Sequence, residues 1–134
     1  MNIEFRKATN SDIGRLAIIR QKQLKEAGAI SEIDISKNIT DYFNAAMADN
    51  TFVAWVATIE DKIISTAGIS FQKKPPYYSN VFGLIGEICN VFTEKEYRRR
   101  GLAKKLLKHI VDEAKSRWRC CFARERVKNG RKPI

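Results

Sequence analysis

Several features that would place a chain outside the ordinary globular class are missing from this sequence. No stretch approaches the roughly 20 apolar residues needed to cross a bilayer. The opening segment, Met1 to Lys7, has neither the basic head nor the apolar run of a secretory signal peptide. We therefore expect no membrane partner and a cytoplasmic location.

Cysteine and histidine are scarce as well. The chain has three cysteines and one histidine, and no CxxC or Cys/His spacing offers a zinc site. We expect neither a disulfide framework nor a structural metal. Cys89 is interpreted as a packing residue and His109 as a helix-face residue, because no base is placed to activate a thiol nucleophile.

The residues that are present have a normal globular balance with an excess of basic charge. A chain of 134 residues, 44% hydrophobic and 30% charged, fits a single domain over residues 1–134 with one core. The formal net charge is +10, and residues 117–134 contribute +6 of it from seven basic residues and one acidic residue. This distribution favours a local anion site and an atypical basic tail over a chain-wide nucleic-acid surface.

Hydrophobic periodicity predicts an α+β fold. Alternating apolar residues predict strands, helical spacing predicts amphipathic helices, and the capping box at residues 9–12 marks a helix start. The elements follow the order β-α-α-β-β-β-α over residues 2–8, 13–27, 35–47, 51–59, 63–71, 81–92 and 102–114. Gly83 and Gly86 interrupt the last strand, and they indicate a bulge or a close backbone approach.

The turn between the last predicted strand and the last helix is the most informative segment. It reads Arg98-Arg99-Arg100-Gly101-Leu102-Ala103. Free N–H groups at a helix N-terminus, together with the positive end of the helix dipole, favour a phosphate ligand. Gly101 and Ala103 are small enough to let an anion approach the backbone, and the arginines add charge and bidentate donors. The turn therefore fits a pyrophosphate.

The pattern Arg98-x-x-Gly101-x-Ala103, placed after a strand that ends Val91-Phe92-Thr93, resembles the coenzyme A pyrophosphate motif of the GNAT superfamily of N-acetyltransferases. The upstream order of one strand, two helices and three antiparallel strands also resembles that family, so the likeness covers about residues 2–116. The resemblance implies a mixed, mostly antiparallel central sheet flanked by helices. It also implies acetyl-CoA as the cofactor and a primary amine of a small molecule or a protein as the acceptor.

The resemblance assigns roles to individual positions. Strand residues before the motif would offer their backbone to the pantetheine arm, and the turn amides would surround the pyrophosphate. These cofactor-binding positions are Val91, Phe92, Thr93, Arg98, Arg99, Arg100, Gly101, Leu102, Ala103 and Lys104. Direct attack of the amine, with a strand N–H stabilising the oxyanion, needs no covalent enzyme intermediate.

Glu87 is the candidate catalytic base. Family members often hold a Glu eleven residues before the first motif position, and Glu87 occupies that place here. An attacking amine is mostly protonated at neutral pH and must lose a proton before it reacts. Burial beside an apolar strand would raise the pKa of this carboxyl toward a useful range. The alternative is an ordinary solvated or salt-bridged strand Glu.

The C-terminus departs from the family pattern. Members normally continue with a fifth strand, a helix that often supplies a Tyr acid, and a hairpin, whereas only Trp118, Cys120 and Phe122 alternate here, in a short strand. Three explanations stay open: a natural short form, completion by a partner chain, or a shifted reading frame near residue 117. We favour the last, and sequencing the gene would contradict it if no single-base change restores an apolar strand. The missing elements predict an exposed sheet edge and hence a homodimer.

Three functions compete at this stage. The leading one is an N-acetyltransferase, the second is a catalytically weak acetyl-CoA-binding domain, and the third is a nucleic-acid-binding protein that uses the basic tail. The third is disfavoured because only Trp118 and Phe122 interleave aromatic groups with the tail charges. Four aromatic residues could line an acceptor site, although the first two also suit the core: Tyr42, Phe43, Tyr77 and Tyr78.

Overall fold

The chain folds in the order of elements that the sequence predicts. The computed structural model describes residues 2–29 and 32–118. Its strands and helices are β1 (Glu4–Lys7), α1 (Ile13–Glu26), α2 (Ser36–Ala48), β2 (Phe52–Ile59), β3 (Lys62–Lys73), β4 (Leu84–Thr93) and α3 (Leu102–Arg117). Short 3-10 turns over Asn10–Asp12 and Lys95–Tyr97 precede α1 and α3. The α+β class and the order β-α-α-β-β-β-α are confirmed. The short strand predicted over Trp118, Cys120 and Phe122 is wrong at Trp118, which caps the C-terminus of α3, and its other positions lie outside the described residues with the rest of the basic tail.

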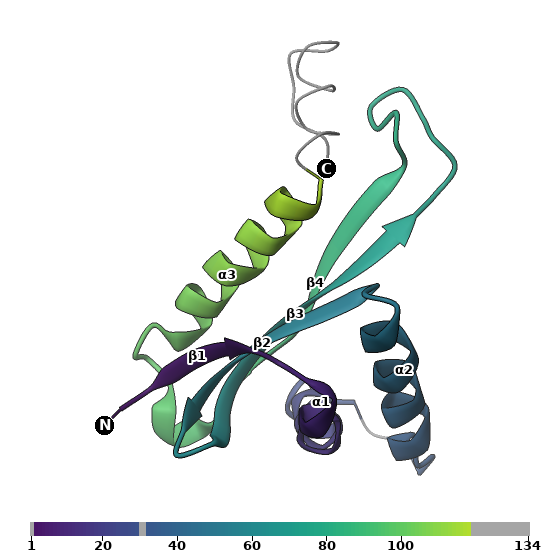
Figure 1. Cartoon of the computed structure of the whole chain (residues 1–134). Coiled ribbons are helices and arrows are strands. Elements are labelled where there is room, and N and C mark those ends of the chain that lie inside the picture. The colour runs from purple at the N-terminus through teal and green to yellow at the C-terminus, as the bar shows by residue number, and fades with distance from the viewer. Residues whose placement is uncertain (1, 30–31, 119–134) are drawn as a thin grey trace.

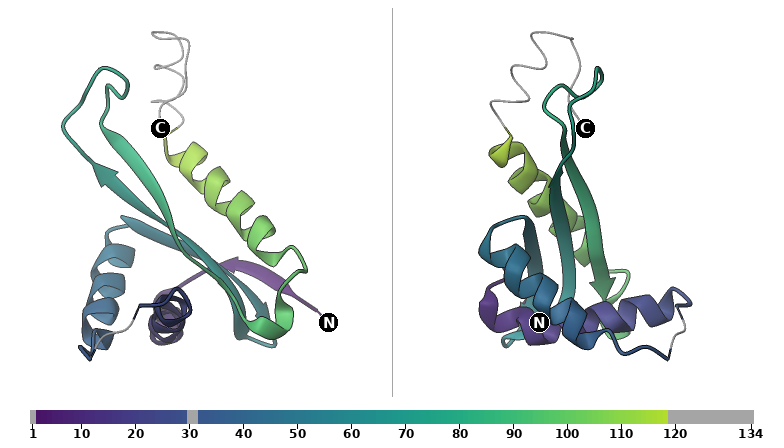
Figure 2. Two further views of the ribbon diagram at one scale, coloured as in Figure 1. Left: turned by 180° about the vertical axis from the view of Figure 1, so that it is seen from behind. Right: turned by 90° about the vertical axis from the view of Figure 1, so that its right-hand side faces the viewer.

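The four strands form one antiparallel sheet between two layers of helix. Their order is β1-β2-β3-β4, so each strand pairs with its neighbours in sequence. Helices α1 and α2 cover one face of the sheet and α3 covers the other, as Figures 1 and 2 show. Within the described residues β4 is an edge strand, so its outer main-chain groups face away from the sheet.

Each face of the sheet has its own apolar cluster. On the side of α1 and α2, Leu16, Ile19 and Phe43 pack with Phe52 and neighbouring strand residues. On the other side, α3 buries Leu102, Leu106 and Ile110, which lie four residues apart and so share one face of the helix. The two clusters hold the helices against the sheet, and they fix where α1, β4 and the start of α3 meet.

The bulge in β4 lies at Asn90 and not at a glycine. The register between β3 and β4 shifts between Thr66 and Gly68, where β4 carries one extra residue. Asn90 has a φ of 59°, which is a left-handed conformation that asparagine tolerates better than most side chains. The hydroxyl of Thr66 donates to the Asn90 carbonyl over 2.6 Å, and this bond satisfies one group that the bulge leaves without a ladder partner.

Of the two readings left open for Gly83 and Gly86, the structure shows close approach at both. Gly83 precedes β4 with a φ of 66°, and a Cβ there would lie 1.9 Å from the Lys74 carbonyl oxygen. A Cβ on Gly86 would lie 2.9 Å from Ile69 and 3.2 Å from Trp118. β4 therefore begins at Leu84, three residues later than the pattern indicated, because the chain turns tightly at Gly83.

Candidate functional site

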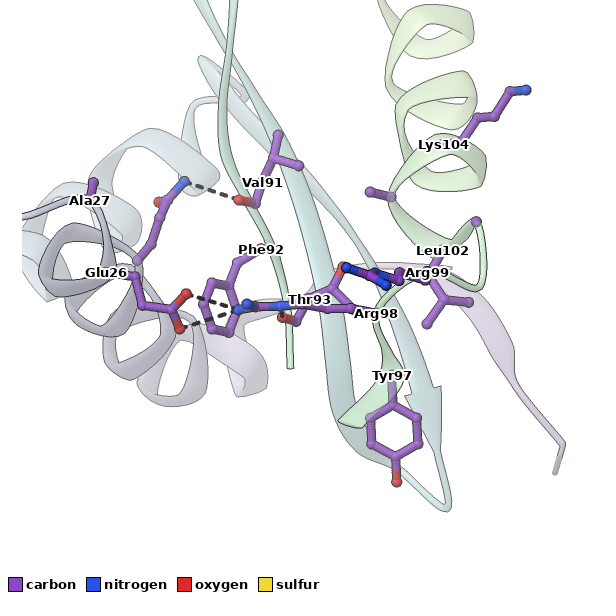
Figure 3. A pocket seen from close by; sticks show the side chains of 13 residues that line it. Glu26, Ala27, Val91, Phe92, Thr93, Tyr97, Arg98, Arg99, Leu102 and Lys104 are labelled. Carbon is purple, nitrogen blue, oxygen red and sulfur yellow. Dashed lines mark hydrogen bonds and ion pairs between the residues drawn. The ribbon is translucent and has the colours of Figure 1, made fainter. Parts of the chain in front are cut away.

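Two cavities adjoin β4 on its approach to α3. The first, here called the α3 groove, has a volume of about 490 Å³ and lies between the C-terminal half of α1, the end of β4 and the start of α3. Its lining residues are Gln23, Glu26, Ala27, Val91, Phe92, Thr93, Tyr97, Arg98, Arg99, Gly101, Leu102, Ala103 and Lys104, and most are labelled in Figure 3. Nine of the ten positions assigned to cofactor binding line this groove, and Arg100 is the exception.

The start of α3 presents main-chain donors to the groove. Gly101 is the N-cap residue, with a φ of 75° and no side-chain cap. The first helical hydrogen bond runs from the N–H of Lys105 to the Gly101 carbonyl. Among the described residues, nothing accepts from the N–H groups of Leu102, Ala103 and Lys104. Arg99 is also left-handed, at 65°, and turns of this kind direct successive N–H groups into a concavity that suits an anion.

The three arginines of the turn have different environments. Arg98 is already engaged: its Nε donates to the Thr93 carbonyl over 2.7 Å, and its guanidinium pairs with Glu26 of α1 at 3.0 Å (Figure 3). Arg100 lies over the Tyr97 ring, 5.4 Å from its centroid, and does not line the groove. Arg99 lines the groove, and within the described residues it has no ion pair. Arg98 therefore braces the turn against α1, and Arg99 is the guanidinium left for a ligand.

Side chains cap the outer edge of β4 beside the groove. Gln23 Nε2 donates to the Val91 carbonyl over 3.1 Å. Arg98 Nε donates in the same way to the carbonyl of Thr93, two residues later on the strand. The part that α1 takes in this site was not predictable from the sequence, because Gln23 and Glu26 are about 70 residues from their partners. Their only local signal is a polar position on the C-terminal half of an amphipathic helix.

Glu94, the residue after β4, connects the turn before α3 to helix α1. It receives ion pairs from Arg15 at 2.6 Å and Lys22 at 2.9 Å, both on α1, and its side chain is 17% exposed. Burial acts to raise the pKa of Glu94, but the hydrogen bond from Lys22 and the charges of Lys22 and Arg15 outweigh it and hold the pKa below its ordinary value. The ionised carboxylate thus joins α1 to the turn.

Glu94→Gln is expected to reduce stability by about 1 kcal/mol at neutral pH, the size of a partly covered ion-pair network. A folded-state pKa that is lowered contributes stability above the unfolded pKa, and that stability is lost as pH falls through the folded pKa. Urea unfolding at pH 7 and pH 3 measures this, and the gap between wild type and variant should shrink at the lower pH. A constant gap would show that the carboxylate charge is not what stabilises the corner.

The second cavity, here called the α2 pocket, has a volume of about 480 Å³ and lies nearer the N-terminal end of β4 than the α3 groove does. Its lining residues are Arg20, Ile35, Asn38, Ile39, Tyr42, Phe43, Phe52, Ser70, Glu87, Cys89 and Asn90. Of the four aromatic candidates, Tyr42 and Phe43 line it, whereas Tyr77 and Tyr78 belong to the β3–β4 loop and do not. The structure thus brings Glu87 together with α2.

Glu87 is exposed, which differs from the burial supposed for a base. It faces Ser70 across the β3–β4 ladder and, among the described residues, has no ion-pair partner. Phe52 of β2 pairs with the same Ser70, so Glu87 lies on β4 where three strands run side by side, and it lines the pocket together with residues of α2. Its carboxylate is therefore a free acceptor at the pocket.

Cys89 and His109 lie where packing explains them. Cys89 is half-buried against the cluster on the α1 side, and burial raises the pKa of its thiol, which disfavours a thiolate nucleophile. His109 stacks on Trp55 with ring centroids 4.2 Å apart, on the α3 side of the sheet, and lines neither cavity. Within residues 2–29 and 32–118 no three side chains are grouped to hold a metal ion, and no helix there has the length and apolar character of a membrane span.

Comparisons with known proteins show a family and a fold. The model of the acetyltransferase (GNAT) family matches residues 19–130. A predicted acetyltransferase from Clostridium acetobutylicum, solved with acetyl-CoA, is 42% identical with a TM-score of 0.83, over 87% of this chain and 75% of that chain. A possible acetyltransferase from Clostridium difficile 630 is 26% identical with a TM-score of 0.67, over 84% and 70% of the two chains. A GCN5-related N-acetyltransferase from Ralstonia eutropha JMP134 shares the fold at 21% identity, with a TM-score of 0.77 over 87% and 78%. No curated protein matches the chain.

Proposed function

The chain belongs to the acetyltransferase (GNAT) family, and we propose that it is an N-acetyltransferase that binds acetyl-CoA in the α3 groove and a primary amine in the α2 pocket. The observation that carries this proposal is the set of unpaired N–H groups at the start of α3, which open into a cavity that nine of the ten assigned positions line. Acetyl-CoA would supply an acetyl group activated as a thioester.

The groove suits an extended ligand with a diphosphate at one end. The N–H groups of α3 and the guanidinium of Arg99 would hold the diphosphate, since a helix N-terminus and an arginine both favour anions. The outer edge of β4 at Val91 and Thr93 would accept the pantetheine arm, because both carbonyls face away from the sheet and are reached by side chains alone. Val91 lines the α3 groove and Asn90, its neighbour on β4, lines the α2 pocket, so an amine in the pocket would lie near the end of that arm.

Glu87 is proposed to take the proton that the ammonium group must lose. Its carboxylate lines the α2 pocket, and no cation among the described residues engages it. Positioning by the two cavities would supply most of the rate, because the amine attacks directly. A homodimer through the open edge of β4 and a cytoplasmic location stay predictions.

Thiol release from acetyl-CoA with a panel of primary amines tests the activity. Turnover with any amine favours the enzyme, whereas coenzyme A binding without turnover favours the catalytically weak binding domain. Within this assay, Glu87→Gln is expected to lower kcat/KM about 100-fold at pH 7, the smaller end of what a general base contributes. The loss should diminish at high pH, because more of the amine is then already neutral.

Glu60→Gln is the matched control for this change. Glu60 is an exposed carboxylate at the β2–β3 turn and lines neither cavity. Its substitution is expected to leave the pH profile unchanged. Full activity and an unaltered profile in Glu87→Gln would remove Glu87 from the mechanism.

A further inference from the structure

The α2 pocket contains two opposite charges that the fold does not pair. Arg20 enters it from α1 and Glu87 from β4. Among the described residues Arg20 has no carboxylate within ion-pair distance, and its guanidinium donates to the neutral Oε1 of Gln23 over 2.9 Å. Leaving a half-buried cation without a counter-ion costs free energy, so a ligand that supplies one gains affinity.

Both charges act on the same part of the pocket. Cys89 lies on β4 between Asn90 and the Glu87 end of the strand, and burial is the main cause of its raised pKa. The charge of Arg20 acts to lower that pKa and the charge of Glu87 acts to raise it further. The fields of the two residues therefore overlap at Cys89, although the side chains come from different elements.

The remaining walls of the pocket are apolar and aromatic. Phe43 and Phe52 pack with ring centroids 5.1 Å apart, and Tyr42 meets Phe52 edge-on at 5.8 Å. Tyr42 keeps 45% of its surface exposed, so part of its ring is available for a ligand. A cavity of about 480 Å³ with one apolar side and a few polar groups is of the size that holds a small molecule.

The cationic side of the pocket adjoins the α3 groove. Arg20 donates to Gln23, and Gln23 donates to the Val91 carbonyl over 3.1 Å, so a chain of two hydrogen bonds links the pocket to the groove. Asn90 lies at the same junction and is 3% exposed, and its Nδ2 has no acceptor among the described residues. The α2 pocket thus has two donors without a charged acceptor: Arg20, which donates to a neutral amide oxygen, and Asn90 Nδ2, which has no acceptor among the described residues.

We propose that the α2 pocket selects an acceptor that carries a carboxylate as well as its primary amine, on an apolar body: a free α-amino acid with an apolar or aromatic side chain. Arg20 binds the carboxylate, Glu87 faces the ammonium, and the aromatic wall contacts the side chain. This deepens the proposed acetyl transfer to the α2 pocket and rests on it. The same pocket disfavours polyamines, which would bring a second cation to Arg20, and protein N-termini, whose carboxylate is replaced by a peptide bond.

L-phenylalanine and L-phenylalaninamide are the probes, because they differ in the carboxylate and share the side chain. The two amines differ in basicity, so the readout is the ratio of their kcat/KM values and how that ratio changes between variants. Arg20→Gln is expected to lower the ratio of phenylalanine to phenylalaninamide roughly 10- to 100-fold, mostly through KM, which is the worth of a charge-assisted hydrogen bond. Arg20→Lys keeps the positive charge but loses the paired N–H donors of the guanidinium, and it should restore part of the ratio.

Lys25→Gln is the control on the same helix. It removes an exposed cation that lines neither cavity, and the ratio is expected to stay at the wild-type value. Calorimetric titration of each variant with coenzyme A checks that the loss of Arg20 has not altered the groove through Gln23. An equal ratio in wild type and Arg20→Gln would overturn the proposal, as would a wild-type preference for a diamine.

Failure of the enzymatic function is distinguishable from failure of this inference. If neither probe is acetylated, titration calorimetry of phenylalanine into the coenzyme A-loaded protein decides whether the carboxylate site exists. Binding that Arg20→Gln weakens at least 10-fold would support the carboxylate site while the acetyl transfer fails. Absence of phenylalanine binding would overturn the site. Turnover of both probes with no dependence on Arg20 would leave the acetyl transfer standing and overturn the selectivity.

Discussion

Ala103→Asp is expected to lower the affinity for coenzyme A roughly 100-fold without destabilising the protein. Ala103 is the second residue of α3 and lines the groove. A carboxylate there complements the positive end of the helix dipole, which is worth about 0.3–1 kcal/mol of stability. The same carboxylate would lie beside the diphosphate, and like charges about 4 Å apart repel by several kcal/mol near a protein surface. Calorimetric titration gives the affinity and thermal unfolding gives the stability.

Ala103→Asn is the matched control, because it adds a side chain of the same size without the charge. We expect it to reduce coenzyme A affinity less than 10-fold. If Ala103→Asp binds as tightly as the wild type, the diphosphate does not lie at the start of α3. If the two variants lose affinity equally, space and not charge limits the ligand at that position.

Gly68→Ala is expected to destabilise the protein by about 1–3 kcal/mol and to raise the KM for the acceptor amine. A Cβ on Gly68 would lie 2.6 Å and 2.8 Å from two ring atoms of Phe52, and 3.3 Å from the Cys89 carbonyl oxygen. Phe52 is 2% exposed and packs on Phe43, so its ring cannot retreat into the core without strain. The open direction is the α2 pocket, which Phe52 lines. Urea unfolding and steady-state kinetics measure the two effects.

Gly14→Ala separates this steric effect from the general effect of replacing a glycine. Gly14 lies near the start of α1, and a Cβ there meets nothing within 4 Å. Alanine suits a helix better than glycine does, so stability should stay equal or increase. A Gly68→Ala variant as stable as Gly14→Ala would show that the Phe52 ring moves without strain. The pocket wall would then deform more easily than its packing indicates.

Local pattern was enough to predict the fold because each element carries its own period. The four-residue spacing of Leu102, Leu106 and Ile110 gives α3, and β-branched runs give β2 and β3. The bulge at Asn90 was not predicted, because the sequence of one strand does not indicate where its pairing with the next strand shifts by one residue. The start of β4 was predicted too early, because Gly83 lies among apolar residues that are typical of a strand. Its left-handed φ instead places it in a turn.

The candidate site divides in the same way. The turn proposed to bind the diphosphate follows from a contiguous motif, so its residues could be named before the structure. The contribution of α1, by contrast, arises from tertiary packing: Gln23 contacts β4 and Glu26 contacts the turn, each from about 70 residues away. Arg98 shows the limit of a motif, because the sequence offers it as a phosphate ligand, whereas Glu26 and the Thr93 carbonyl already engage it.

The central claim is that main-chain N–H groups at the start of α3 bind the diphosphate of coenzyme A. Amide chemical shifts of 15N-labelled protein, recorded during titration with coenzyme A, test it most directly. The largest changes are predicted for the amides of residues 99–104, with smaller changes at Val91 and Thr93, and pantetheine, which lacks the diphosphate, should leave residues 99–104 nearly unmoved. Shifts that cluster on another part of the molecule, or the same changes with pantetheine, would contradict the claim.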